Sequence, residues 1–233
     1  MILTDTPTWA WLFIVVTMLP PIGALALLFL WEIRGPKPVK KVIVGETTIE
    51  LWVRERKFPS RAEAIVIPAA PDLNMNVGIA KWVKDKTANR LQRDAQRAAP
   101  REPGTAFVGS GGKFYFTFAI LAVVMDDSKI TKPEWIANAI THGILQAQEH
   151  DVRTIIIPDM TEDLLRQPQT ITEQARLESC GPIARAMLDG ILSAPDAMET
   201  VKIWVWRSVN LPVFVAEMER LQGLPAGKLA TAH

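Results

Sequence analysis

From Thr6 to Trp31 the chain carries no charged side chain, and its apolar part runs from Trp9 to Trp31 (WAWLFIVVTMLPPIGALALLFLW). At about 1.5 Å per helical residue, this stretch is long enough to cross a hydrocarbon layer of about 30 Å. We therefore predict that residues 1–34 form one transmembrane anchor, with its span at about residues 9–31. The rest of the chain would then be held beside a membrane.

The flanks of this segment predict its orientation. Tryptophans stand at both of its ends, where indole rings settle at the headgroup level, and cations follow it: Arg34, Lys37, Lys40 and Lys41. The N-terminal flank offers only Asp5 and the free amine. The positive-inside tendency predicts a single-pass protein with its N-terminus outside and residues 35–233 in the cytoplasm. The four cations are expected to contact acidic membrane lipid, at about 1 kcal/mol each near the surface.

Two alternatives concern the same segment. A cleaved signal peptide would need a basic start, a shorter apolar core and a small-residue cleavage site, and the chain shows none of these clearly. Pro20 and Pro21 remove backbone donors within the span and are expected to kink the helix. A neighbouring membrane protein would satisfy the freed carbonyls, so a protein partner at this kink and a lone kinked anchor both remain open.

Composition excludes several classes of function. The net charge of +1 and the isoelectric point near 7.9 do not favour nucleic acid as a partner. A single cysteine, Cys180, excludes an internal disulfide. The three histidines, His142, His150 and His233, show no metal-ligand spacing, so metal catalysis is not expected.

The remaining chain has the length of one domain. We predict a juxtamembrane linker at residues 35–41, a single domain at 42–222 and a flexible tail at 223–233. Apolar and alternating runs predict strands at 48–54, 64–67, 114–124, 154–157 and 201–206, with a flexible turn at 109–112. Helices are predicted from Gly78, from Pro133, from about Glu173 and from Pro212, two of them opened by capping boxes at 131–134 and 170–173, while 84–101 is expected to be charged and largely exposed.

Strands that alternate with helices of crossover length indicate an α/β fold, in which a mostly parallel sheet is covered on both faces. Ligands of such sheets bind at the carboxyl ends of the strands. The segments to consider are therefore 68–78, 158–163, and Trp206 with Arg207.

The segments AIVIPAAPDLNMNVGIAKWV, PGTAFVGSGG and FTFAILAVVMDDSKITKPEWIANAITHGILQAQEHDVRTIIIPDM, in this order, resemble the macro domain. This family is a three-layer α/β/α module with a mixed sheet that binds ADP-ribose and, in some members, hydrolyses ADP-ribose linkages. The likeness covers residues 42 to 222. It implies ADP-ribose or a related nucleotide as the ligand and no required cofactor.

The resemblance also implies a set of site positions. The family's Asn-Ala-Ala-Asn motif is similar in position to Pro68, Ala69, Ala70 and Pro71, so both asparagines are prolines here. The remaining implied ligand-binding positions are Asn76, Gly78 and Ile79 in the first diphosphate loop, Asp159 and Thr161 in the second, and Trp206 and Glu55 at the adenine.

The second loop departs furthest from the family. It contains no glycine, and its carboxylates would repel a diphosphate unless they point away. The simplest interpretation of Asp159, Glu162 and Asp163 is a solvated turn whose acids favour the next helix dipole. For Trp206, at the end of an amphipathic strand, the simplest interpretation is a packing residue.

The chain does not offer a positioned acid and base, so we expect no catalytic residues. Two hypotheses about function remain. The first hypothesis is a non-catalytic binding or structural module with a degenerate pocket, anchored at the membrane and facing the cytoplasm. The alternative is a working ADP-ribose reader, or an ADP-ribosyl hydrolase, at the membrane.

Overall fold

The computed structural model describes residues 37–53, 62–87, 89–111, 116–164, 173–194 and 196–222. Contacts divide the chain into two units, Met1–Lys37 and Pro38–His233. The predicted transmembrane span and the predicted tail at 223–233 lie outside the described residues. Among the described helices, none combines the length and the apolar character that a bilayer crossing requires.

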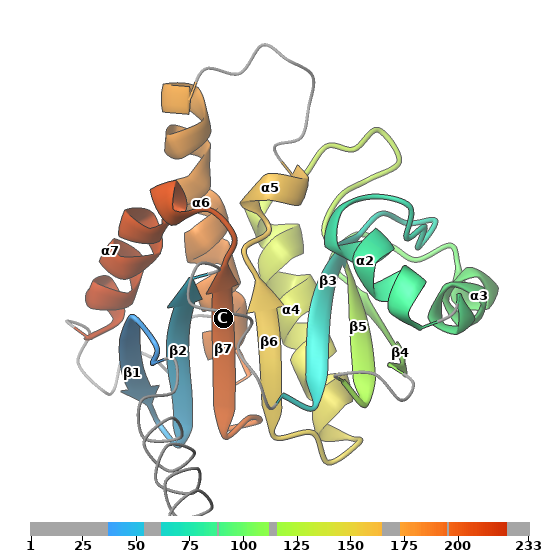
Figure 1. The fold of residues 1–233 in the computed structure, drawn as a ribbon, viewed down its shortest axis with the longest axis horizontal. Coiled ribbons are helices and arrows are strands. Elements are labelled where there is room, and N and C mark those ends of the chain that lie inside the picture. The colour runs from blue at the N-terminus through green and yellow to red at the C-terminus, as the bar shows by residue number, and fades with distance from the viewer. Residues whose placement is uncertain are drawn as a thin grey trace, which may run out of the picture. The chain divides into compact units, whose positions relative to one another are not determined.

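The second unit is built on a seven-stranded mixed sheet (Figure 1). Its strand order is β1-β2-β7-β6-β3-β5-β4. The five central strands, β2, β7, β6, β3 and β5, are parallel to one another. The two edge strands, β1 and β4, are antiparallel to their neighbours. The strands are β1 Lys40–Val44, β2 Thr47–Val53, β3 Ala64–Ala69, β4 Ala106–Ser110, β5 Phe118–Val123, β6 Thr154–Pro158 and β7 Thr200–Val205.

Helices cover both faces of this sheet, as Figure 1 shows, which confirms the predicted α/β class. The helices are α2 Gly78–Lys86, α3 Arg90–Ala98, α4 Pro133–Gln148, α5 Thr161–Leu164, α6 Glu173–Leu192, the 3-10 turn η2 Ser208–Asn210 and α7 Leu211–Gln222. One apolar cluster joins the sheet to α4, α6 and α7, and a second joins it to α2 and α3. Strand β3 contributes to both, because Ala64 and Val66 face the first cluster and Ile65 and Ile67 the second. This double burial explains its continuous apolar sequence.

Two short edge strands differ from the prediction. Strand β1 begins at Lys40, so the last two residues of the predicted linker at 35–41 belong to the sheet. Strand β4 includes Gly109 and Ser110, which were predicted to lie in a flexible turn. A Cβ atom at Gly109 would lie 2.5 Å from Leu91 Cδ1 of α3. Glycine here leaves room for the Leu91 side chain of the neighbouring helix and does not serve a turn.

The capping box predicted at 131–134 is wrong. The N-cap of α4 is Lys132, which makes no side-chain cap. The Thr131 hydroxyl instead donates to the carbonyl of Val124 at 2.5 Å, and Thr131 pairs with Met125 in an isolated bridge. The residue closes the loop between β5 and α4 and is not available to the helix. The predicted start of α4 at Pro133 is confirmed, and the box at Thr170 lies outside the described residues.

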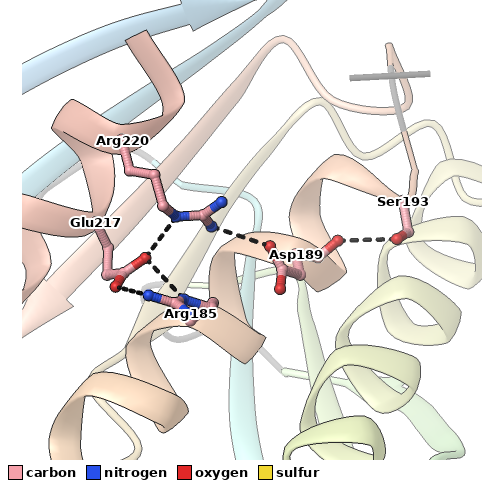
Figure 2. Close-up of polar contacts among 5 residues, drawn as sticks. All are labelled: Arg185, Asp189, Ser193, Glu217 and Arg220. Atoms are coloured by element: carbon pink, nitrogen blue, oxygen red, sulfur yellow. Dashed lines mark hydrogen bonds and ion pairs between the residues drawn. The ribbon is translucent and has the colours of Figure 1, made fainter. Parts of the chain in front are cut away.

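A cluster of ion pairs joins α6 to α7 (Figure 2). The Glu217 carboxylate accepts hydrogen bonds from Arg185 Nη2 at 2.9 Å and from Arg220 Nε at 2.8 Å. Arg220 also reaches Asp189 at 3.3 Å. Partial burial acts to raise the pKa of Glu217, but the hydrogen bonds and charges of the two arginines outweigh it, so the pKa lies below its usual value.

Candidate functional site

Three strand ends meet at the carboxyl edge of the sheet. Strand β6 lies between β7 and β3, so the segments that follow these three strands are neighbours in space. These segments contain all the site positions predicted within the described residues. Glu55, the predicted adenine-edge residue, lies outside the described residues.

The segment after β3 is apolar at its start. Pro68 and Ala69 are the last residues of the strand, where they pair with Ala122 and Val123 of β5, and Ala70 follows them. All three side chains are buried, as is that of Pro71. At this strand end, the positions that resemble the family's asparagines therefore present buried rings and no hydrogen-bonding side chain.

A glutamine that the sequence analysis missed holds the next part of this segment. Gln92 of α3 is buried, accepts the amide hydrogen of Met75 at 2.6 Å and donates to the carbonyl of Leu73 at 3.2 Å. Both bonds satisfy backbone groups that secondary structure does not pair. The loop is thereby fixed to the α3 helix before it reaches Asn76.

The start of α2 resembles an anion-binding turn in one respect. Gly78 has a φ of +57°, a conformation that favours glycine, and the N-cap Val77 provides no side-chain cap. The first-turn amides thus lack a side-chain acceptor from their own cap. Asn76 is exposed and its side-chain oxygen accepts a hydrogen bond from Lys84, whereas Ile79 is buried in the apolar cluster beneath α2. Because its side chain is buried, Ile79 has only its backbone to offer to a ligand.

The segment after β6 holds a buried polar cluster, which we call the Asp159 cluster: Asp159, Thr161 and Asn210. Asp159 Oδ1 accepts the amide of Thr161 at 2.9 Å and its hydroxyl at 2.6 Å. Asn210 Nδ2 donates to Asp159 Oδ2 and to Thr161 Oγ1, both at 2.8 Å. Asp159 is 2% exposed, and the other two side chains are fully buried. The interpretation of Asp159 as part of a solvated turn is therefore wrong.

This cluster connects two strand ends. The Asp159 amide donates to the carbonyl of Trp204 at 2.8 Å, and Asn210 lies in η2, which follows β7. Because Asp159 and Thr161 both take hydrogens from Nδ2 of Asn210, the orientation of that amide is fixed by its partners. The carboxylate is thus turned inward and satisfied within the protein.

Trp206 follows the end of β7 and is half buried. Its ring packs edge-on against Trp204, with ring centroids 5.0 Å apart and an interplanar angle of 76°. It also contacts the apolar cluster beneath α2 and α3. The contacts of the ring support a packing role, and its partial exposure is compatible with stacking on a base.

Other chemically active side chains serve the fold. His142 Nδ1 accepts the amide hydrogen of Ala106 at 3.1 Å and so ties α4 to the edge strand β4. Cys180 is buried in α6. Within the described ranges, His, Cys, Asp and Glu side chains do not gather in any group of three that would hold a metal.

A groove of about 440 Å³ lies between the start of α4 and the middle of α6, beside Glu217 of α7, and none of the predicted site positions that the structure describes lines it. Of its charged lining residues, Arg185, Asp189 and Glu217 belong to the ion-pair cluster of Figure 2, and Glu134 lies in the first turn of α4. The three clustered side chains are engaged with one another and with Arg220.

The fold and this edge can be compared with known proteins. Residues 66–175 match the Macro domain family. An uncharacterized protein of Aquifex aeolicus is 24% identical over 144 residues, which cover 61% of this chain and 87% of that protein. An uncharacterized protein of Aeropyrum pernix is 31% identical over 101 residues, which cover 43% of this chain and 53% of that protein.

Solved macrodomains share the fold at low sequence identity. The Oceanobacillus iheyensis macrodomain with ADP has a TM-score of 0.62 at 15% identity, covering 78% of this chain and 96% of that one. The Trypanosoma brucei macrodomain in complex with ADP-ribose has a TM-score of 0.55 at 12% identity, covering 74% and 68%. The second unit therefore has the macro domain fold, and solved structures of this fold contain ADP and ADP-ribose. At the two strand ends that the resemblance singles out, this chain has Pro68 and Pro71 at the first and the buried Asp159 carboxylate at the second.

Proposed function

We propose that this protein is a membrane-anchored, cytoplasm-facing macro-like module that does not catalyse and whose nucleotide pocket is degenerate. The observation that carries the proposal is the Asp159 cluster. A loop that binds a diphosphate must offer N–H or O–H donors to it. Here the Asp159 carboxylate already takes the Thr161 amide, the Thr161 hydroxyl and the Asn210 amide.

The position of the carboxylate strengthens this argument. Asp159 is 2% exposed and follows β6 directly, where the resemblance implies the second diphosphate loop. A phosphate brought to this loop would find these donors already taken by the inward-facing carboxylate, and the negative charge of that carboxylate would also disfavour a second anion nearby. We infer that ADP-ribose binds weakly or not at all.

The first strand end supports the absence of catalysis. Hydrolysis requires a group that positions or activates a water at the ribose. Pro68 and Pro71 have no side-chain donor or acceptor, and the Asp159 carboxylate is already engaged with Thr161 and Asn210. We therefore propose a binding or structural role, with a membrane-protein partner at the Pro20–Pro21 kink of the anchor.

Calorimetry with ADP-ribose tests the pocket. A fragment of residues 37–233 retains all of β1, whereas a fragment that begins at Lys41 would lose the first residue of that strand. The proposal predicts a dissociation constant of about 1 mM or weaker for this fragment. A micromolar constant would overturn it.

Protease treatment of sealed, right-side-out vesicles tests the anchor and its orientation. The proposal predicts that the intact chain stays with the membrane after alkaline extraction and that residues 35–233 are protected until detergent is added. Release of the chain by alkali, or digestion of the domain without detergent, would contradict it.

A second candidate is a working ADP-ribose reader at the membrane. It is favoured by the Gly78 turn without a side-chain cap and by the accessible part of Trp206. Stacking of a base on an aromatic ring contributes about 1 to 3 kcal/mol. This candidate therefore predicts micromolar binding that weakens at least fivefold in Trp206→Ala.

A further inference from the structure

We propose that the outer face of α2 and α3 is a docking surface for an anionic lipid bilayer. We call it the basic face: Lys81, Lys84, Lys86, Arg90, Arg93, Arg97 and Arg101, with Val77 and Trp82. The inference rests on the membrane part of the proposed function and is independent of nucleotide binding.

The charge of this face is far from the average of the chain. Residues 78–101 contain seven basic and two acidic side chains, a net charge of +5, whereas the whole chain has a net charge of +1. The two acids are already paired, Asp85 with Lys81 at 2.7 Å and Asp94 with Arg97 at 3.3 Å. The hydrogen bond from Lys81, together with the charges of the neighbouring lysines, lowers the pKa of Asp85, which is the response expected in a positive potential.

The packing of the two helices points these charges outward. Ile79, Ala80 and Val83 of α2 are buried against the sheet, as are Leu91 and Ala95 of α3. The cations fall on the opposite side, where Lys81, Lys86, Arg90, Arg93 and Arg97 are exposed. The near-neutral net charge of the sequence conceals this segregation.

Apolar side chains accompany the cations. Val77 is 65% exposed and Trp82 is 37% exposed, and both are among the most exposed large apolar residues that the structure describes. A tryptophan beside lysines and arginines is typical of surfaces that lie at the headgroup level of a membrane. Nucleic acid would also accept the positive charge, but an exposed valine adds nothing to phosphate binding.

The sequence between the predicted anchor and the domain is short. The Val39 amide donates to the carbonyl of Leu51, so the chain enters the domain near the carboxyl end of β2. Helix α2 begins at the same edge of the sheet, after β3, which is four strand spacings from β1, or roughly 19 Å. The eight residues from Trp31 to Val39 extend by at most about 28 Å, so the predicted anchor would hold the domain close to the lipid.

The full chain in lipid nanodiscs tests this proposal. Discs of phosphatidylcholine alone are compared with discs containing about one third phosphatidylglycerol, all with lipids brominated near the headgroup, which quench tryptophans at the interface. The signal of Trp82 is the difference between the wild type and Trp82→Phe. Trp135→Phe, which removes a half-buried ring of α4, is the matched control.

We expect quenching of Trp82 in the anionic discs only, and a loss of at least half of it in the variant Arg90→Gln, Arg93→Gln, Arg97→Gln. A variant that neutralises exposed cations elsewhere, Lys132→Gln, Arg153→Gln, Arg185→Gln, should keep the wild-type quenching. Absence of Trp82 quenching, equal quenching in both kinds of disc, or an unchanged signal in the α3 variant would overturn the proposal. Tight binding of an oligonucleotide that needs the α3 arginines, without Trp82 quenching, would overturn it in favour of nucleic acid.

If residues 9–31 do not anchor the chain in the membrane, alkaline extraction would release the chain, which is a separate observation. Flotation with phosphatidylglycerol vesicles would then test the same face. Each arginine is expected to contribute about tenfold or less to the affinity for these vesicles. The α3 variant, which lacks three of them, should therefore lose vesicle affinity on the order of a hundredfold. Equal flotation of the wild type and the α3 variant would overturn the proposal.

Discussion

Asn210 Nδ2 lies 2.8 Å from Oδ2 of Asp159, although 51 positions separate the two residues in the sequence. The bond joins the turn after β7 to the loop after β6, at the edge where ligands of parallel sheets bind. Because the same amide also holds Thr161, the loop is fixed by contacts inside the protein. Its shape does not depend on a bound phosphate.

Asn210→Ala should therefore destabilise the domain. It removes two buried hydrogen bonds, one of them to the Asp159 carboxylate, and together these contribute about 2 to 4 kcal/mol. Denaturant unfolding of residues 37–233 measures the change. Asn74→Ala, at an exposed position of the loop after β3, is the control and should stay within about 0.5 kcal/mol of the wild type. Equal stability of the two variants would show that the cluster contributes nothing.

The contact between α4 and α6 predicts a sharp difference between two glycines of α6. A Cβ atom at Gly190 would lie 2.6 Å from the carbonyl oxygen of Ala137, so Gly190→Ala should cost about 1 to 3 kcal/mol through overpacking. At Gly181 no other heavy atom of the described chain lies within 4 Å of the added Cβ, so Gly181→Ala should stabilise the domain by about 0.5 to 1 kcal/mol through the higher helix propensity of alanine. Thermal unfolding of both variants checks this, and a loss of stability at Gly181 that equals or exceeds the loss at Gly190 would contradict the packing.

The Glu217 cluster predicts a dependence of stability on pH. The pKa of Glu217 is lower in the folded domain than in the unfolded chain, so its contribution is present above the unfolded value of about 4.5 and is lost as the pH falls through the folded value. Glu217→Gln should cost about 1 to 2 kcal/mol at pH 7, and the cost should fall as the pH is lowered from 4.5 towards 3. Unfolding curves at the two pH values measure this. A cost that does not change with pH would mean that the arginines stabilise α7 by packing alone.

Much of the fold could be predicted because its signals are local. The continuous apolar run of β3 reflects burial on both faces, and Pro133 starts α4 as expected. The short edge strands β1 and β4 were missed because one begins with lysines and the other contains a glycine. In both strands the pairing with a neighbour outweighs the local preference.

The site was harder to predict because its determinants are distant in sequence. Gln92 and Asn210 carry no motif and act through single hydrogen bonds to loops far along the chain. Asp159 seemed exposed because acids follow it, yet partners from two other positions make its burial possible. A resemblance to a family indicates where a loop lies, but it does not show which way a carboxylate points.

Titration of residues 37–233 with ADP-ribose, for the wild type and for Asp159→Ser, decides whether the Asp159 carboxylate closes the pocket. The substitution removes the negative charge and the acceptor that holds the Thr161 amide and the Asn210 amide. The proposal predicts binding of about 1 mM or weaker in the wild type and at least tenfold tighter binding in Asp159→Ser. Micromolar binding by the wild type that weakens in Asp159→Ser would contradict it, because the buried carboxylate would then support the pocket that it is proposed to close.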